Sequence, residues 1–400
     1  MISAMTSDFV RELLAGEGNK LYFPNADWLF PNGLNIDRVM FTIPGLDIDV
    51  YWYGFLIALG MLLAMIYGFK RLNQWGLEPD RFTDTVLVGL VGGIVGARLF
   101  YVIFSLDRYL TDEGTFDIVA ALSIRDGGLA IYGGVIGALV LGCTMAKIRK
   151  VNIPALLDLV GLGFLIGQSL GRWGNFFNQE AFGSKTTLPW GMTSKSIINY
   201  LHSFYYPERV SVVTADALDL VAHPCFLYES LWCITGLVLL HIYSKRRKFD
   251  GEVFLGYIGW YGLGRFWIEG LRTDSLYIPG TPFRVSQVIA GTCVLFAIAL
   301  IVLIRMNIKK GGYTLYRDTE ESKQLLALYE EKKAKSNRRG KNANDECETI
   351  LDASIIAEDE EGDALSEESE ETVTSEETPD EAVPETENNE TDEIKETENE

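Results

Sequence analysis

The chain has 400 residues, of which 48% are hydrophobic, and a formal net charge of −20. Residues 341–400 carry 25 of the 55 acidic residues, 2 of the 35 basic residues and no aromatic residue, so residues 1–340 are close to neutral. The charge therefore describes the tail, and a uniformly acidic globular protein is excluded. We expect the tail to be disordered, because it cannot bury enough apolar surface to offset its chain entropy.

Seven apolar segments follow an N-terminal arm, residues 1–50, that is too polar for a signal peptide. Each is close to the roughly 20 residues that a helix needs to cross a bilayer. They are residues 51–69, 83–104, 127–146, 153–175, 224–242, 253–270 and 285–304. The expected fold is an all-α polytopic membrane protein with seven transmembrane helices in residues 51–310. Glycines at 92, 93 and 96 and at 163, 167 and 171 predict close helix packing.

Basic residues set the orientation of these spans. A basic cluster follows each odd-numbered span, with Lys70 and Arg71, Lys147 to Lys150, Lys245 to Lys248, and Arg305 to Lys310. All four clusters fall on one side, which the positive-inside rule makes the cytoplasm. The N-terminus is then outside, and loop 176–222 is a small external subdomain. A charged helix in residues 311–340 and the acidic tail are cytoplasmic.

Cysteine and histidine patterns predict no metal site. The five cysteines contain no CxxC pair, and the three histidines do not have metal-ligand spacing. A disulfide framework is equally unsupported.

Polar side chains gather at one depth of the predicted bundle. Gln168, Arg172 and Asn175 share one helical face, and so do Tyr261, Arg265, Glu269 and Arg272. Ionisable residues in a span are costly and indicate function. With the orientation above, this set lies in the outer half of the bilayer, and Asp158 is the main polar residue of the inner half.

A polar site open to one leaflet argues against a channel, which would show polar faces along its full depth. Guanidinium groups offer planar, bidentate donors for phosphate. The residues therefore indicate an enzyme that binds an outer-leaflet phospholipid. Two alternatives stay open. One is a lipid or solute transporter, which needs polar positions at both faces and inverted repeats, and the other is a headgroup-exchange enzyme with an alcohol acceptor.

Segment 171–183, GRWGNFFNQEAFG, resembles the GRxGNFxNxExxG signature of the prolipoprotein diacylglyceryl transferase family. Three more stretches agree in order and spacing: DGGLAIYGG from 126, HP and LYE within 223–229, and YGLGRFWIE from 261. The resemblance covers about residues 40–306.

The resemblance implies transfer of the diacylglyceryl group of phosphatidylglycerol to the lipobox cysteine thiol of a preprolipoprotein. A thioether forms and glycerol phosphate leaves. It also implies a multi-pass protein of the bacterial plasma membrane with its active site toward the outer leaflet. The expected partners are phosphatidylglycerol, preprolipoprotein signal peptides and the bilayer, with no cofactor, no metal and no nucleic acid.

Residue roles follow from the same resemblance. Arg172 and Arg265 would bind the phosphate and stabilise the leaving group. The other positions expected to bind substrate are Tyr53, Arg98, Asn175, Asn178, Glu180, Gly183, His223, Tyr228, Glu229, Tyr261, Glu269 and Arg272.

Two positions depart from the family pattern. Tyr132 stands where many members carry His, and Phe226 stands where Gln is common. Tyr132 is a candidate catalytic residue, but a tyrosine hydroxyl is a poor general base at neutral pH. Either Tyr132 only hydrogen-bonds the substrate, or the thiol proton goes to another group such as Glu269, or to water.

Overall fold

The computed structural model describes residues 6–338 except 17–18, 27, 29, 46, 111–113, 124–126, 210–211, 213–216 and 218. The chain divides into two compact units, Met1–Lys332 and Lys333–Glu400. The acidic tail, residues 341–400, lies outside the described residues.

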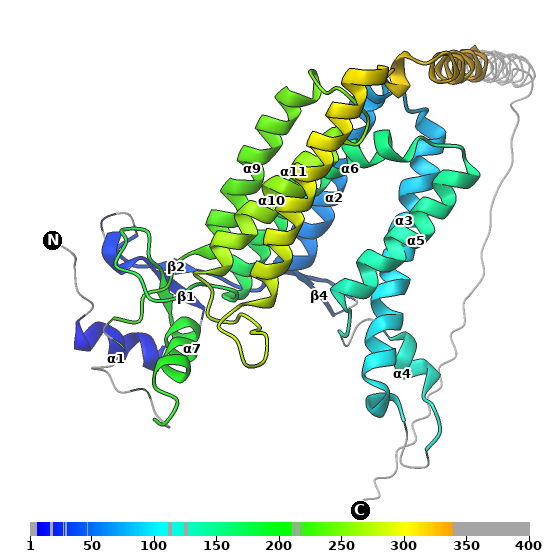
Figure 1. Cartoon of the computed structure of the whole chain (residues 1–400). Coiled ribbons are helices and arrows are strands. Elements are labelled where there is room, and N and C mark those ends of the chain that lie inside the picture. The colour runs from blue at the N-terminus through cyan, green and yellow to red at the C-terminus, as the bar shows by residue number, and fades with distance from the viewer. Residues whose placement is uncertain are drawn as a thin grey trace, which may run out of the picture. The chain divides into compact units, whose positions relative to one another are not determined.

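Long helices form the bulk of the first unit (Figure 1). In chain order they are α2 (Trp52–Trp75), α3 (Pro79–Phe104), α5 (Ile131–Ile148), α6 (Ile153–Asn178), α9 (Cys225–Ser244), α10 (Glu252–Glu269) and α11 (Val285–Gly311). All except α10 are long and apolar enough to cross a membrane. The predicted sixth span coincides with α10, which carries the charged residues Glu252, Arg265 and Glu269. The other six predicted spans are therefore confirmed as candidates, and the sixth span stays a prediction.

Helices α6, α9, α10 and α11 pack in succession, and α2 packs on α6. Helix α3 pairs with α5, and this pair lies beside the other helices in Figure 1. Glycine lets the pair approach through backbone contact, since a Cβ on Gly137 would lie 2.1 Å from the Gly92 carbonyl oxygen. The predicted glycine packing is thus confirmed for α3. On α6, a Cβ built on Gly60 of α2 would lie 3.2 Å from the Gly167 Cα, but a Cβ built on Gly167 or Gly171 would meet no atom within 4 Å.

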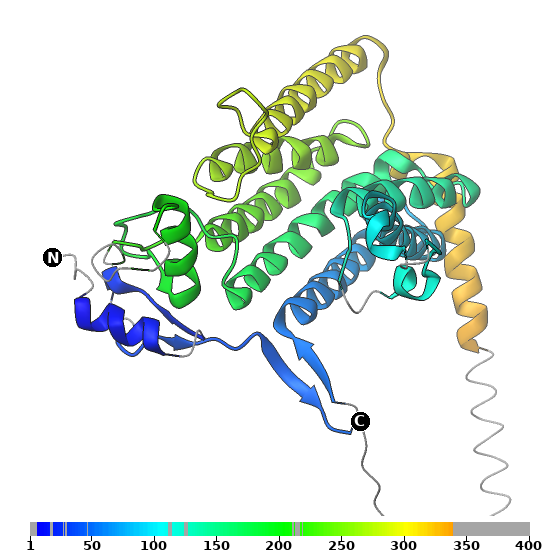
Figure 2. The ribbon, with the colours of Figure 1, turned by 90° about the horizontal axis from the view of Figure 1, so that it is seen from below.

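The N-terminal arm and loop 176–222 form one subdomain, not two separate parts. Helix α1 (Ser7–Ala15) packs with α7 (Lys195–Tyr205) around a shared core that includes Val10, Leu21 and Leu201. Strand β1 (Lys20–Tyr22) pairs antiparallel with β2 (Leu34–Asn35) and with β5 (Thr193–Ser194). The blue and green segments lie together in Figures 1 and 2.

A hairpin of β3 (Val39–Ile43) and β4 (Ile48–Tyr51) leads from this subdomain into α2, and the short helix α4 (Ile118–Leu122) follows α3. Three 3-10 turns complete the named elements: η1 (Pro24–Ala26), η2 (Leu106–Tyr109) and η3 (Tyr316–Asp318). The prediction of an all-α fold was wrong in this respect. The strands are short, and in the subdomain they pair segments that are far apart in the sequence.

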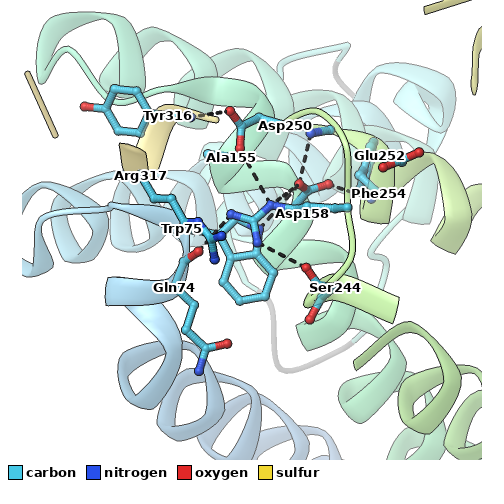
Figure 3. Close-up of polar contacts among 12 residues, drawn as sticks. Gln74, Trp75, Ala155, Asp158, Ser244, Asp250, Glu252, Phe254, Tyr316 and Arg317 are labelled. Carbon is cyan, nitrogen blue, oxygen red and sulfur yellow. Dashed lines mark hydrogen bonds and ion pairs between the residues drawn. The ribbon is translucent and has the colours of Figure 1, made fainter. Parts of the chain in front are cut away.

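At the end of the bundle opposite the subdomain, Asp158 of α6 caps the first turn of α10 (Figure 3). Its carboxylate accepts hydrogen bonds from the backbone N–H groups of Gly251, at 2.9 Å, and Phe254, at 2.8 Å. Helix α10 has no side-chain cap of its own, so Asp158 satisfies N–H groups that the helix leaves unpaired. Asp158 is therefore a structural residue that fixes α10 against α6.

The segment after α11 closes the same end. The chain leaves the helix at Gly312, where φ is +77°, and residues 320–338 are helical again. Tyr316 donates its backbone N–H to Asp250 at 2.7 Å, and the buried Ser322 hydroxyl donates to the Gly76 carbonyl at 2.8 Å. Residues 313–323 thus pack on the bundle, and the predicted charged helix begins later than residue 311.

Candidate active site

Three arginines converge on one buried carboxylate at the end of the bundle near the subdomain. Glu229, near the start of α9, is 4% exposed. Its Oε2 lies 2.6 Å from Arg172 Nη2 of α6, and its Oε1 lies 3.1 Å from Arg265 Nη1 of α10. Arg272, just after α10, reaches Oε1 at 3.5 Å. Four of the predicted site residues therefore meet, although they come from three separate parts of the chain.

Two further carboxylates balance the arginine charges. Glu269 pairs with Arg265 at 2.6 Å, one helical turn away, and Asp274 pairs with Arg272 at 2.5 Å. Burial alone would lower the pKa of Arg272, but hydrogen bonding to Asp274 raises it above its usual value. Burial raises the pKa of Asp274, yet the Arg272 guanidinium brings it below its usual value. The three arginine charges are thus matched by three carboxylates, those of Glu229, Glu269 and Asp274.

The guanidiniums are still reachable. The side chains of Arg172 and Arg265 are 23% and 21% exposed, whereas Glu229 and Glu269 lie beneath them at 4% and 2%. Arg172 uses Nη2 for Glu229 and for Tyr261, whose hydroxyl lies 3.5 Å away. A guanidinium has five N–H donors, so donors remain for a second anion.

A reciprocal pair of tryptophans holds α9 against α10 beside the arginines. Trp232 and Trp260 stack with centroids 4.4 Å apart, and each indole Nε1 donates a 2.9 Å hydrogen bond to the other's carbonyl. Gly264 makes room for the Trp232 ring, because a Cβ at this position would lie 2.3 Å from ring atoms. Since Arg265 is the next residue, this contact sets the position of its backbone.

The signature loop after α6 is built around Glu180. The side-chain amides of Asn175 and Asn178 both donate to Glu180 Oε1, at 3.0 and 3.2 Å. Gly183 lies against the backbone of the arginine site, because a Cβ there would lie 2.8 Å from the His223 Cβ and 3.0 Å from a carbonyl preceding Arg272. This loop therefore adjoins the arginine network.

Tyr228 and His223 form a second polar group on the side of the loops. The Tyr228 hydroxyl accepts a 2.7 Å hydrogen bond from Trp190 Nε1 and lies 3.1 Å from His223 Nδ1. Burial lowers the pKa of His223, which favours the neutral imidazole. Trp190 was not predicted as a site residue; an isolated Trp in a long loop gives no signal of its partner.

Arg98 contacts backbone instead of the arginine network. Its guanidinium donates to four carbonyls: Ala120 at 2.8 Å, Ala121 at 2.8 Å, Gly127 at 2.7 Å and Gly128 at 3.0 Å. Gly127 and Gly128 have φ values of +83° and +80°, which non-glycine residues rarely adopt. These contacts fix the loop that leads into α5.

Among the described residues, neither Tyr132 nor Tyr53 forms a hydrogen bond with Glu229 or with the three arginines. Tyr132, at the start of α5, is 68% exposed. Tyr53 packs its ring against α6 at Gly174, where a Cβ would lie 2.4 Å from it. Asp274, which pairs with Arg272, was not predicted as a site residue. Gln168, which shares a helical face with Arg172, donates to the Tyr257 hydroxyl at 2.9 Å.

The chain matches the family model described as prolipoprotein diacylglyceryl transferase over residues 38–303. A phosphatidylglycerol–prolipoprotein diacylglyceryl transferase of Clostridium novyi (strain NT) is 40% identical over 277 residues, which cover 68% of this chain and 97% of the relative. Relatives of the same name from Clostridioides difficile (strain 630) and Bacillus cereus (strain 03BB102) are 37% and 38% identical, over 64% and 68% of this chain and 90% and 93% of their own lengths. The chain is a multi-pass membrane protein and belongs to the prolipoprotein diacylglyceryl transferase family.

Proposed function

We propose that the chain transfers the diacylglyceryl group of phosphatidylglycerol to the lipobox cysteine of a preprolipoprotein, with Arg172 and Arg265 on the phosphate. The observation that carries these roles is the convergence of both guanidiniums on Glu229, at 2.6 and 3.1 Å. Planar donors fixed in this way suit a phosphodiester. Family membership supplies the reaction class.

In this reaction the cysteine sulfur attacks the glycerol carbon that bears the phosphate ester. A C–S bond forms, the C–O bond breaks, and glycerol phosphate leaves with the bonding electrons. Negative charge grows on the departing phosphate, so donors already in place stabilise the transition state more than the substrate. Arg172 and Arg265 are fixed by carboxylates before substrate arrives, which removes the cost of orienting them.

The thiol proton needs an acceptor, and Tyr132 is a weak candidate. Its side chain is 68% exposed, and a tyrosine hydroxyl is a poor base at neutral pH. We propose that Tyr132 at most hydrogen-bonds substrate. The remaining substrate contacts are assigned to the loop around Glu180 and to Tyr261, which touches Arg172.

We place the arginine site toward the outer leaflet of the bacterial plasma membrane. Arg172, Glu229 and Arg265 share one end of the helices, and the basic residues at 70–71, 147–150, 245–248 and 305–310 lie at or just after the other ends of α2, α5, α9 and α11. A cysteine at the exposed Ser203, in a chain without its native cysteines, should react with an impermeant maleimide on intact cells. A cysteine at Lys309 should react only after permeabilisation, and the reverse pattern would overturn this orientation.

The activity test is mass spectrometry of a lipobox peptide incubated with phosphatidylglycerol and the purified protein. Wild type should add one diacylglyceryl group to the cysteine. Arg172→Gln and Arg265→Gln should each lower turnover at least 100-fold, since one transition-state donor supplies about 10²–10³ in rate. Arg149→Gln is the matched control, because Arg149 pairs with Asp84 at the far end of the bundle, at 2.7 Å.

The identity of the acceptor distinguishes the proposed transferase from a headgroup-exchange enzyme. Glycerol or water as acceptor, with no peptide product, would favour headgroup exchange. Near-normal turnover by either arginine variant would contradict the assigned roles.

A further inference from the structure

A second basic cluster lies at the end of the bundle opposite the arginine site. It consists of Tyr67 and Arg71 on α2 with His241 on α9 and Lys245 just after it. His241 follows Glu229 by twelve positions on α9, which is about 18 Å along the helix. The cluster is therefore separate from the proposed substrate site.

The hydrogen bonds within this cluster leave some of its N–H and O–H donors without an acceptor. The Tyr67 hydroxyl lies 2.8 Å from His241 Nδ1, and Arg71 Nη1 lies 3.4 Å from His241 Nε2. Arginine can only donate, so Nε2 of the neutral ring accepts and Nδ1 carries the hydrogen. That hydrogen points to the Tyr67 oxygen. The Tyr67 hydroxyl proton is then free for another acceptor.

In the part of the chain that the structure describes, no carboxylate balances the positive charge of the cluster. Among the described residues, Arg71, His241 and Lys245 form no ion pair with a carboxylate, and Arg71 Nε and Nη2 are shielded from water without a hydrogen-bond partner. The rings of Tyr67 and Trp75, at 5.7 and 5.9 Å, give Arg71 only cation–π support.

The neighbouring Arg247 shows the contrast. It also stacks on Trp75, but Asp250 and Asp158 lie 3.8 and 4.0 Å from its Nε. A shielded cation without a counter-ion is costly. The charges of Arg71 and Lys245 both act on His241, so the local field is positive.

We propose that this cluster binds a phosphate group, and that Arg71, Tyr67, His241 and Lys245 form the site. The phosphate of an anionic phospholipid in the nearby leaflet and free inorganic phosphate share this chemistry. Basic sites between helices at a membrane surface are suited to such headgroups. The phosphate supplies the counter-ion that Arg71 lacks and accepts the free Tyr67 proton. This inference does not depend on the transferase reaction.

The test measures phospholipid bound to the purified full chain in nonionic detergent by native mass spectrometry, during titration with phosphatidylglycerol. Arg71→Gln should lose one bound lipid equivalent or bind it at least tenfold more weakly. Lys70→Gln removes the same charge from an exposed neighbour and should match wild type. A lipid at the arginine site contributes equally to all three proteins, so the difference reports this site alone.

Two further arms identify the source of the phosphate. Diacylglycerol with the same acyl chains should bind all three proteins equally, because it has no phosphate. Inorganic phosphate is then added at millimolar concentration. If the lipid stays bound, the occupant is a lipid headgroup. If the lipid is displaced and phosphate stays bound, the occupant is free phosphate.

Equal binding of both the lipid and inorganic phosphate by wild type, Arg71→Gln and Lys70→Gln would overturn the proposal. So would equal loss in both variants, which indicates diffuse charge attraction without a site. If Arg71→Gln does not purify as a single species, Tyr67→Phe gives the second test. It removes one donor, and binding of that lipid equivalent should weaken about threefold or more; unchanged binding would contradict the site.

Discussion

A single methyl group at Gly264 should separate α9 from α10 and disturb the arginine site. The Cβ of alanine would lie 2.3 Å from Trp232 Cδ1 and Nε1. The ring cannot simply move aside, because it stacks on Trp260 and donates to the Trp260 carbonyl at 2.9 Å. Relief therefore requires a shift of the helices or the loss of both contacts.

The expected cost follows from these contacts. Overpacking costs about 1–3 kcal/mol, and loss of the indole hydrogen bond adds about 1 kcal/mol. Alanine favours a helix over glycine by about 1 kcal/mol. The free energy of unfolding should therefore fall by about 1–3 kcal/mol. Arg265 follows Gly264 directly, and a displacement of about 1 Å can cost about 100-fold in rate, so transfer should fall at least tenfold.

Gly259→Ala is the matched control on the same helix. Its Cβ would meet only Ala297, at 3.7 Å, which is an ordinary contact. Thermal unfolding in detergent and thioether formation on the lipobox peptide are measured for both variants. The reasoning fails if Gly264→Ala matches Gly259→Ala in both measurements.

Three other predictions concern the site and the two ends of the bundle. Tyr132→Phe should keep more than a third of wild-type thioether formation, and complete loss by a folded variant would show that its hydroxyl is needed. A chain ending after residue 311 should unfold at lower temperature than one ending after residue 338, because only the shorter chain lacks the segment that packs on the bundle; equal unfolding temperatures would refute this. Arg272 holds the pKa of Asp274 below its usual value, so the stability from this pair is present above about pH 4 and is lost as pH falls through the lowered pKa. Between pH 5 and pH 3, wild type should lose more stability than Asp274→Asn, and parallel pH profiles would contradict the assignment.

The membrane-spanning helices could be predicted from the sequence, because the thickness of the bilayer sets the length of the apolar segments. Six apolar runs coincide with candidate spans, and the start of α11 was predicted to the residue. Helical spacing also placed Arg265 and Glu269 one turn apart, where they pair. These inferences depend on local periodicity alone.

Long-range contacts could not be predicted in the same way. Leu21 pairs with Ser194 across 173 positions, and no local pattern specifies this strand pairing. Arg98 gives the same signal as Arg172 in the sequence, since each is an arginine in an apolar segment. Its partners are backbone carbonyls, which every loop offers. The contacts of Glu229 with three arginines could not be predicted either, because they depend on how three separate chain segments pack together.

The cap that Asp158 of α6 places on α10 fixes the start of α10 at one position along α6. Fourteen positions separate Asp158 from Arg172 on α6, and eleven separate Phe254 from Arg265 on α10. At 1.5 Å per residue these lengths are about 21 and 17 Å. Adding or deleting one residue in either stretch would rotate its arginine by about 100° about the helix axis. Natural variation in length should therefore be confined to the loops, and the spacing within these two stretches should be invariant among active relatives.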